Sequence, residues 1–207
     1  MSQKGILAVV SGFSGAGKGT LMKALLERYA QQYALSISAT TRKPRVGEEH
    51  GREYFFLEKD AFEQLIAEDA LIEHACYVGN YYGTPKSYVL EQMEAGRDVI
   101  LEIEIQGALE VKKKFPETLL LFVTPPSAKE LESRLRGRGT ETEAVIRDRL
   151  SRAVEEAEFM EQYDYILVND DLDTCVQDMH RLIQAQHQRC SENRDFIRQM
   201  KQELNEL

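Results

Sequence analysis

The sequence has few cysteines, and they do not form a recognisable pattern. Cys76, Cys175 and Cys190 are an odd number, without Cys-x-x-Cys spacing and without a matching cluster of histidines. Neither a disulfide framework nor a zinc site is therefore expected, and we interpret the three cysteines as reduced, inert thiols.

The sequence also lacks long hydrophobic runs and an excess of basic residues. No apolar run approaches the length of a membrane helix, and the N-terminus lacks the charged, apolar and small-residue order of a secretory signal. The net charge of -9 argues against nucleic acid or an anionic membrane surface as the main partner. We therefore expect a cytoplasmic protein that binds neither, either a monomer or a homodimer, whose anionic ligand is small and locally held.

One stretch near the N-terminus has the pattern of a site for nucleotide phosphates. An apolar, β-branched run from residue 6 to residue 10 leads into the spacing Gly12-x-x-x-x-Gly17-Lys18, which is the Walker A pattern, and an apolar pattern of helical period follows. The glycines leave backbone N–H groups free to converge on phosphate oxygens, and the helix adds its positive dipole end. An ordinary strand-to-helix turn is the alternative interpretation. The residues expected to contact the donor phosphates are Gly12, Phe13, Ser14, Gly15, Ala16, Gly17, Lys18, Gly19 and Thr20.

The rest of the chain alternates between expected strands and helices. Strands are expected at residues 35–42, 52–57, 70–78, 98–105, 119–123 and 164–168, with helices between most of them and an amphipathic pattern from residue 173 to the end that breaks near Ser191. This order predicts an α/β fold of three layers, a parallel sheet covered by helices on both faces, with the ligand at the carboxyl ends of the strands. Residues 34–88 form a strand-rich insertion into this core.

Charged residues gather at three places that suit a phosphate site. Arg42 and Arg45 flank a proline in a turn and make a plausible anion clamp. Glu102 and Glu104 punctuate an apolar strand, as the acids near a Mg²⁺ ion do in phosphate-loop proteins, although an edge strand would also place them on one face. Arginines around Gly137 and Gly139 suit a lid that closes on phosphates, while a solvated charge run is the alternative.

Four further motifs narrow the class of protein. They are Ser38-Ala39-Thr40-Thr41-Arg42-Lys43-Pro44-Arg45, Gly79-Asn80-Tyr81-Tyr82-Gly83-Thr84, Leu101-Glu102-Ile103-Glu104-Ile105-Gln106-Gly107 and Arg136-Gly137-Arg138-Gly139-Thr140, and Val168-Asn169-Asp170-Asp171 follows near the end. In this order and spacing the chain resembles the guanylate kinase family over nearly its whole length. The resemblance implies transfer of the γ-phosphoryl group of ATP to GMP, with Mg²⁺, in purine nucleotide metabolism.

The resemblance also implies an organisation and roles for particular residues. It implies a P-loop core at residues 1–33, 89–133 and 154–207, a GMP-binding insertion at 34–88 and a lid at 134–153. Arg42, Arg45, Tyr54 and Tyr82 match residues that hold the GMP phosphate, Ser38 and Thr84 match donors to guanine O6, and Glu73 and Glu104 match acceptors from guanine N1–H and the 2-amino group. Lys18, Arg42, Arg134, Arg138 and Arg149 are the expected catalytic residues, and Asn169 lies where the adenine edge would pass.

Gly19 replaces the hydroxyl residue that usually follows the lysine of a Walker A motif. Thr20 and Glu102 are therefore the expected Mg²⁺ residues, directly or through water. Two other functions stay open: a kinase for another monophosphate, and a guanylate-kinase-like binding module without catalysis. Glu73 and Glu104 argue against the first, because a base without guanine's donors would leave two carboxylates unpaired. The intact glycines and Lys18 argue against the second.

Overall fold

A computed structural model of the chain describes residues 4–77, 79–137 and 142–207. Its centre is a five-stranded sheet in the order β2-β7-β1-β8-β9, and every neighbouring pair of strands is parallel. The strands are β1 (Leu7–Gly12), β2 (Tyr33–Leu35), β7 (Asp98–Glu102), β8 (Leu119–Thr124) and β9 (Tyr165–Val168). The central strands β1 and β8 are buried almost throughout, which is why they read as continuous apolar runs in the sequence.

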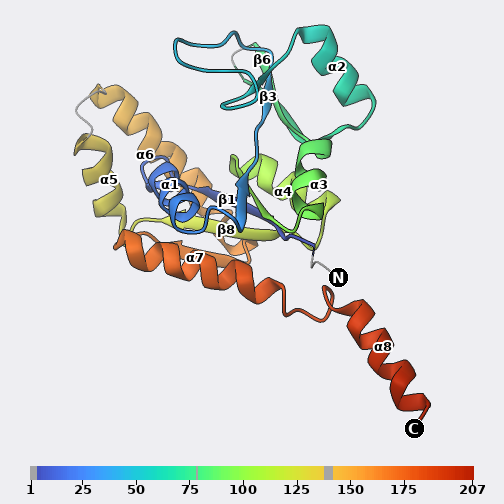
Figure 1. The fold of residues 1–207 in the computed structure, drawn as a ribbon. Helices are drawn as coiled ribbons and strands as arrows, with labels where there is room; N and C mark the ends of the chain where they lie inside the picture. The colour runs from blue at the N-terminus through green and yellow to red at the C-terminus, as the bar shows by residue number, and fades with distance from the viewer. Residues whose placement is uncertain (1–3, 78, 138–141) are drawn as a thin grey trace.

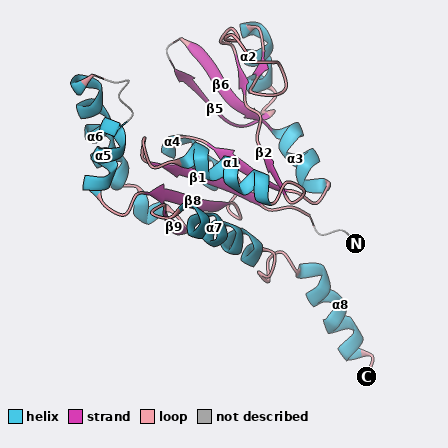
Figure 2. Cartoon of the chain, turned by 60° about the vertical axis from the view of Figure 1, so that its left-hand side comes forward, coloured by secondary structure: helices cyan, strands magenta, loops and turns pink. Residues whose placement is uncertain are grey.

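Helices connect and cover this sheet (Figures 1 and 2). They are α1 (Lys18–Arg28), α3 (Lys86–Glu94), α4 (Ile105–Lys114), α5 (Ala128–Gly137), α6 (Glu143–Ala157), the short 3₁₀ helix η1 (Met160–Gln162), and α7 (Leu172–Gln186). The connection through α1 runs towards the β2 edge of the sheet, whereas the connection through α4 runs towards the β9 edge. Because such crossovers are right-handed, α1 and α4 lie on opposite faces, and the expected layered α/β architecture is confirmed.

A second sheet stands apart from the first, with α2 (Lys59–Ala67) beside it (Figure 2). Its order is β4-β3-β6-β5, formed by β3 (Ala39–Thr40), β4 (Phe55–Phe56), β5 (Leu71–Tyr77) and β6 (Asn80–Pro85). Phe62 of α2 packs with Ala39 and Leu71 in a small core of its own. The segment that sequence patterning described as strand-rich therefore builds a separate mixed sheet.

Three expected elements differ from those observed. The strand expected at residues 35–42 is two strands, because the backbone pairs with β7 up to Leu35 and with β4 and β6 from Ala39. The strand expected at 52–57 shortens to β4, since a turn with Gly51 at a φ of 84° precedes it. Strand β7 ends at Glu102, and Glu104 is the N-cap of α4, so these two acids do not share a strand face.

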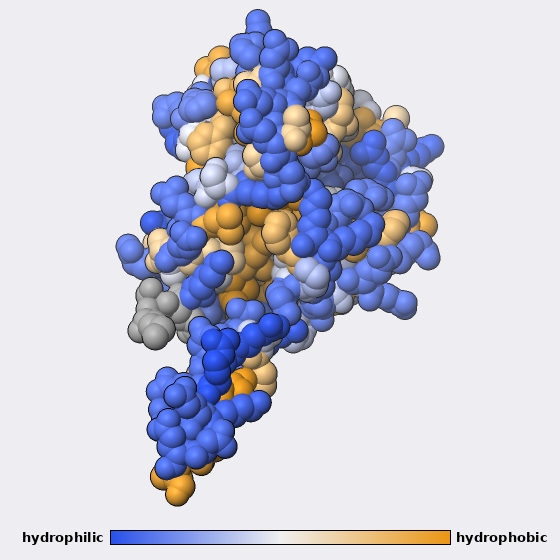
Figure 3. All heavy atoms as spheres, turned by 90° about the vertical axis from the view of Figure 1, so that its right-hand side faces the viewer, coloured by the Kyte–Doolittle hydropathy of each residue, from blue (hydrophilic) through white to orange (hydrophobic). Residues whose placement is uncertain are grey.

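The apolar positions Ile197, Met200 and Leu204 of the C-terminal helix, which an amphipathic pattern would ordinarily place on the core, do not pack there. Helix α8 (Arg194–Asn205) projects away from the rest of the molecule (Figures 1 and 3) and has no buried residue. Phe196 and Leu204 are 61% and 60% exposed. The amphipathic pattern predicts that a helix forms, but not which surface, if any, covers its apolar face.

We predict that α8 contributes little to the stability of the core. A chain that ends at Asn193 should have a melting temperature within about 2 °C of the full chain, because no buried side chain is removed. A chain that ends at Gln186 should melt several degrees lower. It loses His187, whose Nε2 lies 2.8 Å from the Oδ1 of buried Asp98. Equal melting temperatures for these two truncations, measured by calorimetry, would contradict this account.

Candidate active site at the carboxyl ends of the strands

The phosphate loop is shaped by glycines that other residues could not replace. Gly12 ends β1 with a φ of 148°, and a Cβ atom there would lie 2.0 Å from the backbone oxygen of Val123. Gly17 has a φ of 88° and is the N-cap of α1, without a side chain that caps the helix. Because glycine has no side chain, the N-cap residue does not accept a hydrogen bond from the first N–H groups of α1. This arrangement is the one that binds anions at helix N-termini.

Lys18 lies where the loop meets α1. Its Nζ donates hydrogen bonds to the backbone oxygens of Gly12 at 2.7 Å and Phe13 at 3.2 Å. A cavity of about 270 Å³ opens beside it, lined by Ser14, Gly15, Gly17, Lys18, Gly19, Thr20 and Glu102. The two residues expected to hold Mg²⁺, Thr20 and Glu102, thus reach the same cavity from α1 and from the end of β7.

Asn169 supports the loop from β9. Its side chain is 6% exposed, and its Nδ2 donates to the backbone oxygen of Ala16 at 2.8 Å. The same nitrogen would lie 2.5 Å from a Cβ atom on Gly17, so it packs closely under the loop. The amide nitrogen expected near adenine therefore contacts the phosphate loop in this structure.

Helices α5 and α6 carry two of the three arginines that were expected to close on the phosphates. Arg149 of α6 donates to the side-chain oxygen of Ser14 in the loop. Arg134 of α5 pairs with Glu130 one turn earlier, with Nε 2.8 Å from Oε1. Arg136 bridges the two helices through Glu143. Arg138 lies outside the described residues.

The second sheet brings together three of the residues that the resemblance assigned to guanine. Thr84 of β6 donates to the carboxylate of Glu73 on β5 at 2.8 Å, and the Ser38 and Thr84 hydroxyls are 3.5 Å apart. Burial raises the pKa of Glu73, and the hydrogen bond from Thr84 opposes that effect only in part. Residues separated by 46 positions thus form one polar cluster, because β5 and β6 are antiparallel and the chain before β3 runs beside them.

The residues expected around the acceptor phosphate also lie together. The guanidinium carbon of Arg42 is 5.3 Å from the centroid of the Tyr54 ring, and the Tyr54 and Tyr82 rings are 6.2 Å apart. Arg45 is exposed, and its backbone N–H donates to the carboxylate of Glu48. Glu48, which sequence reasoning missed, pairs with Arg42. The sequence feature that could have indicated this pair is an acid six residues after an arginine, in a turn that contains a glycine.

A cavity of about 460 Å³ contacts both the phosphate loop and residues that were expected at the acceptor site. It is lined by Gly12, Ser14, Lys18, Tyr54, Glu102, Ile103, Glu104, Ile105 and Glu156. Sequence reasoning also missed Glu156, which lies on α6 two helical turns after Arg149. Burial raises its pKa, as does the negative charge of Glu104, while Lys18 opposes both. One continuous space thus contacts the phosphate-loop lysine as well as Tyr54 and Glu104, which were expected to contact the acceptor nucleotide.

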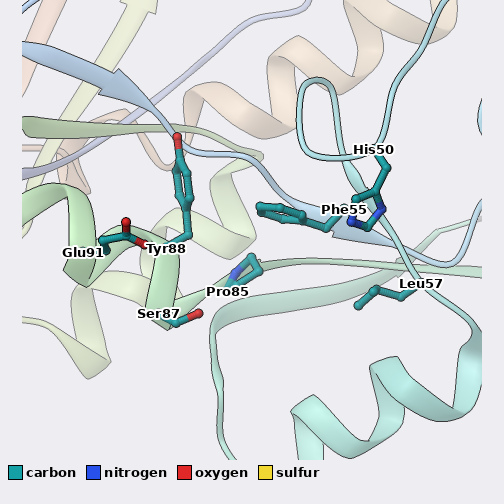
Figure 4. A pocket seen from close by; sticks show the side chains of 7 residues that line it. All are labelled: His50, Phe55, Leu57, Pro85, Ser87, Tyr88 and Glu91. Atoms are coloured by element: carbon teal, nitrogen blue, oxygen red, sulfur yellow. The ribbon is translucent and has the colours of Figure 1, made fainter.

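Another cavity, of about 290 Å³, lies between the second sheet and α3 (Figure 4). Apolar groups of Phe55, Leu57, Pro85 and Tyr88 line it together with His50, Ser87 and Glu91, and none of the residues predicted for the site is among them. Tyr88 also lines a cavity of about 480 Å³ that contains Ser38, Tyr54 and Glu102. The smaller cavity therefore adjoins the larger one through Tyr88, without containing a residue predicted for the site.

Two general features hold for the described parts of the chain. No group of three or more histidine, cysteine or acidic side chains there could hold a metal ion. Among the same residues, no helix combines the length and the apolar character that crossing a bilayer requires. Thr20 and Glu102 supply oxygen ligands, which suit a Mg²⁺ ion that keeps most of its waters.

Comparison with known proteins identifies the family. The guanylate kinase family model matches residues 4–186. The chain is 48% identical over 189 residues to the guanylate kinase of Latilactobacillus sakei subsp. sakei (strain 23K), covering 91% of this chain and 93% of the relative. It is 47% identical over 203 residues to the guanylate kinase of Caldanaerobacter subterraneus subsp. tengcongensis, covering 98% of each.

A solved structure agrees with these sequence matches. The crystal structure of guanylate kinase from Anaplasma phagocytophilum matches with a TM-score of 0.68 and 30% identity, covering 91% of this chain and 89% of the other. The sequence matches and the fold agree: this chain belongs to the guanylate kinase family.

Proposed function

We propose that this protein transfers the γ-phosphoryl group of ATP to GMP, giving ADP and GDP, as a cytoplasmic enzyme of purine nucleotide metabolism. The observation that carries the proposal is the cavity that contacts Lys18 on one side and Tyr54 and Glu104 on the other. A phosphoryl group passed between two nucleotides needs a single space with a phosphate loop at one end and an acceptor site at the other.

The donor half is proposed to be the loop Gly12–Thr20 with Asn169 beneath it. The ammonium group of Lys18 would leave the carbonyls of Gly12 and Phe13 and contact the β- and γ-phosphates. Mg²⁺ would be held by the phosphates, by water and by Thr20 or Glu102, and it neutralises phosphate charge when bound. The core proposed to position this half comprises residues 1–33, 89–133 and 154–207, from which α8 projects without a buried residue.

The acceptor half is proposed to be the insertion, residues 34–88, together with Glu104. Arg42, Arg45, Tyr54 and Tyr82 would hold the phosphate of GMP, because guanidinium and phenol groups donate to a dianion. Ser38 and Thr84 would donate to guanine O6, and Glu73 and Glu104 would accept from N1–H and the 2-amino group. Adenine lacks the 2-amino group and has an acceptor at N1, so AMP would leave these acids unpaired.

The lid, residues 134–153, is proposed to complete the site when both nucleotides are bound. Arg134, Arg138 and Arg149 would neutralise charge on the transferring phosphoryl group, and Arg149 already contacts the loop through Ser14. The acceptor is a phosphate oxygen that is mostly ionised near neutral pH, so no general base is required. Closure also excludes water, which would otherwise compete as the acceptor.

The proposal is tested by ADP release with each nucleoside monophosphate as the acceptor. We expect kcat/KM for GMP to exceed that for AMP, CMP and UMP by at least about a hundredfold. Comparable rates with AMP and GMP would overturn the guanine assignment. GMP binding without ADP release would instead support a binding module without catalysis.

A further inference from the structure

The loop between β3 and β4 holds an ion pair inside the acceptor half of the site. Nη1 of Arg42 donates to Oε2 of Glu48 at 2.9 Å, and Nη2 donates to Oε1 at 3.0 Å. The two side chains are only 16% and 18% exposed. Two parallel hydrogen bonds between a guanidinium and a carboxylate fix both the distance and the plane of the guanidinium.

The backbone of this loop places Glu48 where it can make that contact. The N–H of Glu48 donates to the backbone oxygen of Arg45 at 3.0 Å, and the N–H of Arg45 donates back to the Glu48 carboxylate at 2.7 Å. Gly47 allows the tight turn with a φ of 88°. The hydrogen bonds from Arg42 and Arg45 lower the pKa of Glu48, so its carboxylate stays ionised near neutral pH.

The geometry of the guanidinium decides which of its donors remain for a ligand. Arginine has five N–H donors in a rigid plane. The contacts to Glu48 use the edge formed by Nη1 and Nη2, and the second hydrogen of Nη1 serves the backbone oxygen of Lys43 at 2.8 Å. Tyr82 is the other side chain that hydrogen-bonds to Arg42. Glu48 and Lys43 leave Nε–H and the second hydrogen of Nη2, which lie side by side on the adjacent edge. That edge can bind two oxygens of one phosphate group.

Aromatic rings hold the same plane from the side. The guanidinium carbon of Arg42 lies 5.3 Å from the centroid of Tyr54 and 5.7 Å from that of Phe56. The Tyr82 hydroxyl also raises the pKa of Arg42, although less than Glu48 does. Tyr54 and Tyr82 were both assigned to the acceptor phosphate, so the guanidinium is held among the groups proposed to share that ligand.

We propose that Glu48 is a positioning residue that aligns Arg42 for the phosphate of the acceptor nucleotide. It occupies one edge of the guanidinium and thereby presents the other edge as a two-donor fork. This inference rests on the proposed function, because it assigns Arg42 to the acceptor phosphate. The opposite role, in which Glu48 masks Arg42 and competes with that phosphate, predicts the opposite change when its charge is removed.

The test is steady-state kinetics of Glu48→Gln with ATP and GMP. We expect KM for GMP to rise about tenfold, the effect of weakening one charge-assisted contact. We expect kcat and KM for ATP to change less than about twofold. Arg42 is proposed to bind the acceptor phosphate equally in the ground state and the transition state, and loss of such binding raises KM for GMP without lowering kcat. Glu48→Asp, which keeps the charge on a shorter side chain, should give a KM between those of wild type and Glu48→Gln.

A double-mutant cycle shows whether Glu48 acts through Arg42. In Arg42→Lys the guanidinium fork is absent, so adding Glu48→Gln should raise KM for GMP less than about twofold further. A tenfold rise in both backgrounds would overturn the inference. So would an unchanged or lowered KM in Glu48→Gln alone, the latter supporting the masking role.

The matched control is Glu49→Gln in the same loop. Glu49 is exposed and pairs with Arg52 at 2.9 Å, so its KM for GMP should stay at the wild-type value. A melting temperature like that of Glu49→Gln would show that Glu48→Gln is folded. Absence of ADP release by the wild-type protein would overturn the proposed function itself, whereas an active wild type with an unaffected Glu48→Gln overturns only this inference.

Discussion

Replacing Lys18 with alanine is expected to lower kcat for GMP phosphorylation about a thousandfold. Lys18 is the cation of the phosphate loop, and its Nζ lies at the carbonyls of Gly12 and Phe13, where donor phosphates would replace them. Phosphoryl transfer depends on such preorganised charge far more than on a nucleophilic side chain. Because GMP is proposed to bind to the other half of the site, its dissociation constant should change less than about threefold, as measured by calorimetry.

Lys23→Ala is the control for Lys18→Ala. Lys23 lies on the same helix, but its side chain is 77% exposed and its nearest acid, Glu27, is 3.9 Å away. The Lys23 variant should keep the wild-type kcat. Undiminished turnover by Lys18→Ala would remove the proposed mechanism, and a parallel loss of GMP affinity would mean that the two halves of the site are not separable.

Glu73→Gln is expected to lower kcat/KM for GMP about a hundredfold. The carboxylate would accept a hydrogen bond from guanine, and loss of a hydrogen bond to a charged group, with an amide donor now facing guanine's donors, accounts for that magnitude. Glu110→Gln is the control, because Glu110 is exposed on α4 and pairs with Lys113. Equal loss with IMP, which lacks the 2-amino group, would assign Glu73 to N1–H, whereas a smaller loss with IMP would assign it to the 2-amino group. An unchanged kcat/KM for GMP would contradict a role in recognising guanine.

The same substitution is expected to stabilise the nucleotide-free protein at neutral pH. Burial raises the pKa of Glu73 in the folded state above its unfolded value. The stability contributed by the protonated form is therefore fully present below the ordinary glutamate pKa, about 4.3, and is lost as the pH rises through the raised value. Glutamine stays neutral throughout, so the melting temperature of Glu73→Gln relative to wild type should increase from about pH 4 to about pH 7. A difference that is constant or shrinks over this range would contradict the burial of an ionised carboxylate.

A buried acid that lowers stability is understandable at a binding site. Thr84 donates hydrogen bonds to Glu73 from its hydroxyl and from its backbone, and the cation that lowers the pKa of Glu73 is Lys114, whose effect is smaller than that of burial. Such a group is retained where a ligand supplies the missing donors. The gain in stability and the loss of activity predicted for Glu73→Gln have the same cause, which is removal of a buried negative charge that a ligand would otherwise pair.

Local patterns carried most of the prediction for the phosphate loop. Burial on both faces makes β1 continuously apolar, the positive φ angles require glycine at positions 12, 15 and 17, and the helix must begin at Lys18 to direct its N–H groups at the loop. Each of these requirements is satisfied by residues within a dozen positions. The start of α6 is also determined locally, since Thr142 caps the helix by accepting from the N–H of Val145.

Other features could not be predicted because they depend on partners far along the chain. An alternating pattern at residues 35–42 indicates extended backbone, but not that β2 pairs with β7 while β3 pairs with β6. In the sequence, Glu48 resembles many other surface acids. Its contact with Arg42, which the sequence pattern did not predict, depends on the turn at Gly47. The apolar stripe of α8 indicated a covered face, and no part of the described core covers it.

Residue order alone therefore determined the family and the layered α/β core, and it predicted the chemistry of the two nucleotide halves, because motifs of specific residues at specific spacing encode local backbone shape and local charge. Tertiary structure decided which of these residues share a cavity, how the guanidinium of Arg42 is oriented, and that Glu156 lines the same cavity as Glu104 and Lys18. Those facts depend on strand order, helix packing and side-chain direction. They arise from contacts between residues that are distant in sequence, which no local pattern contains.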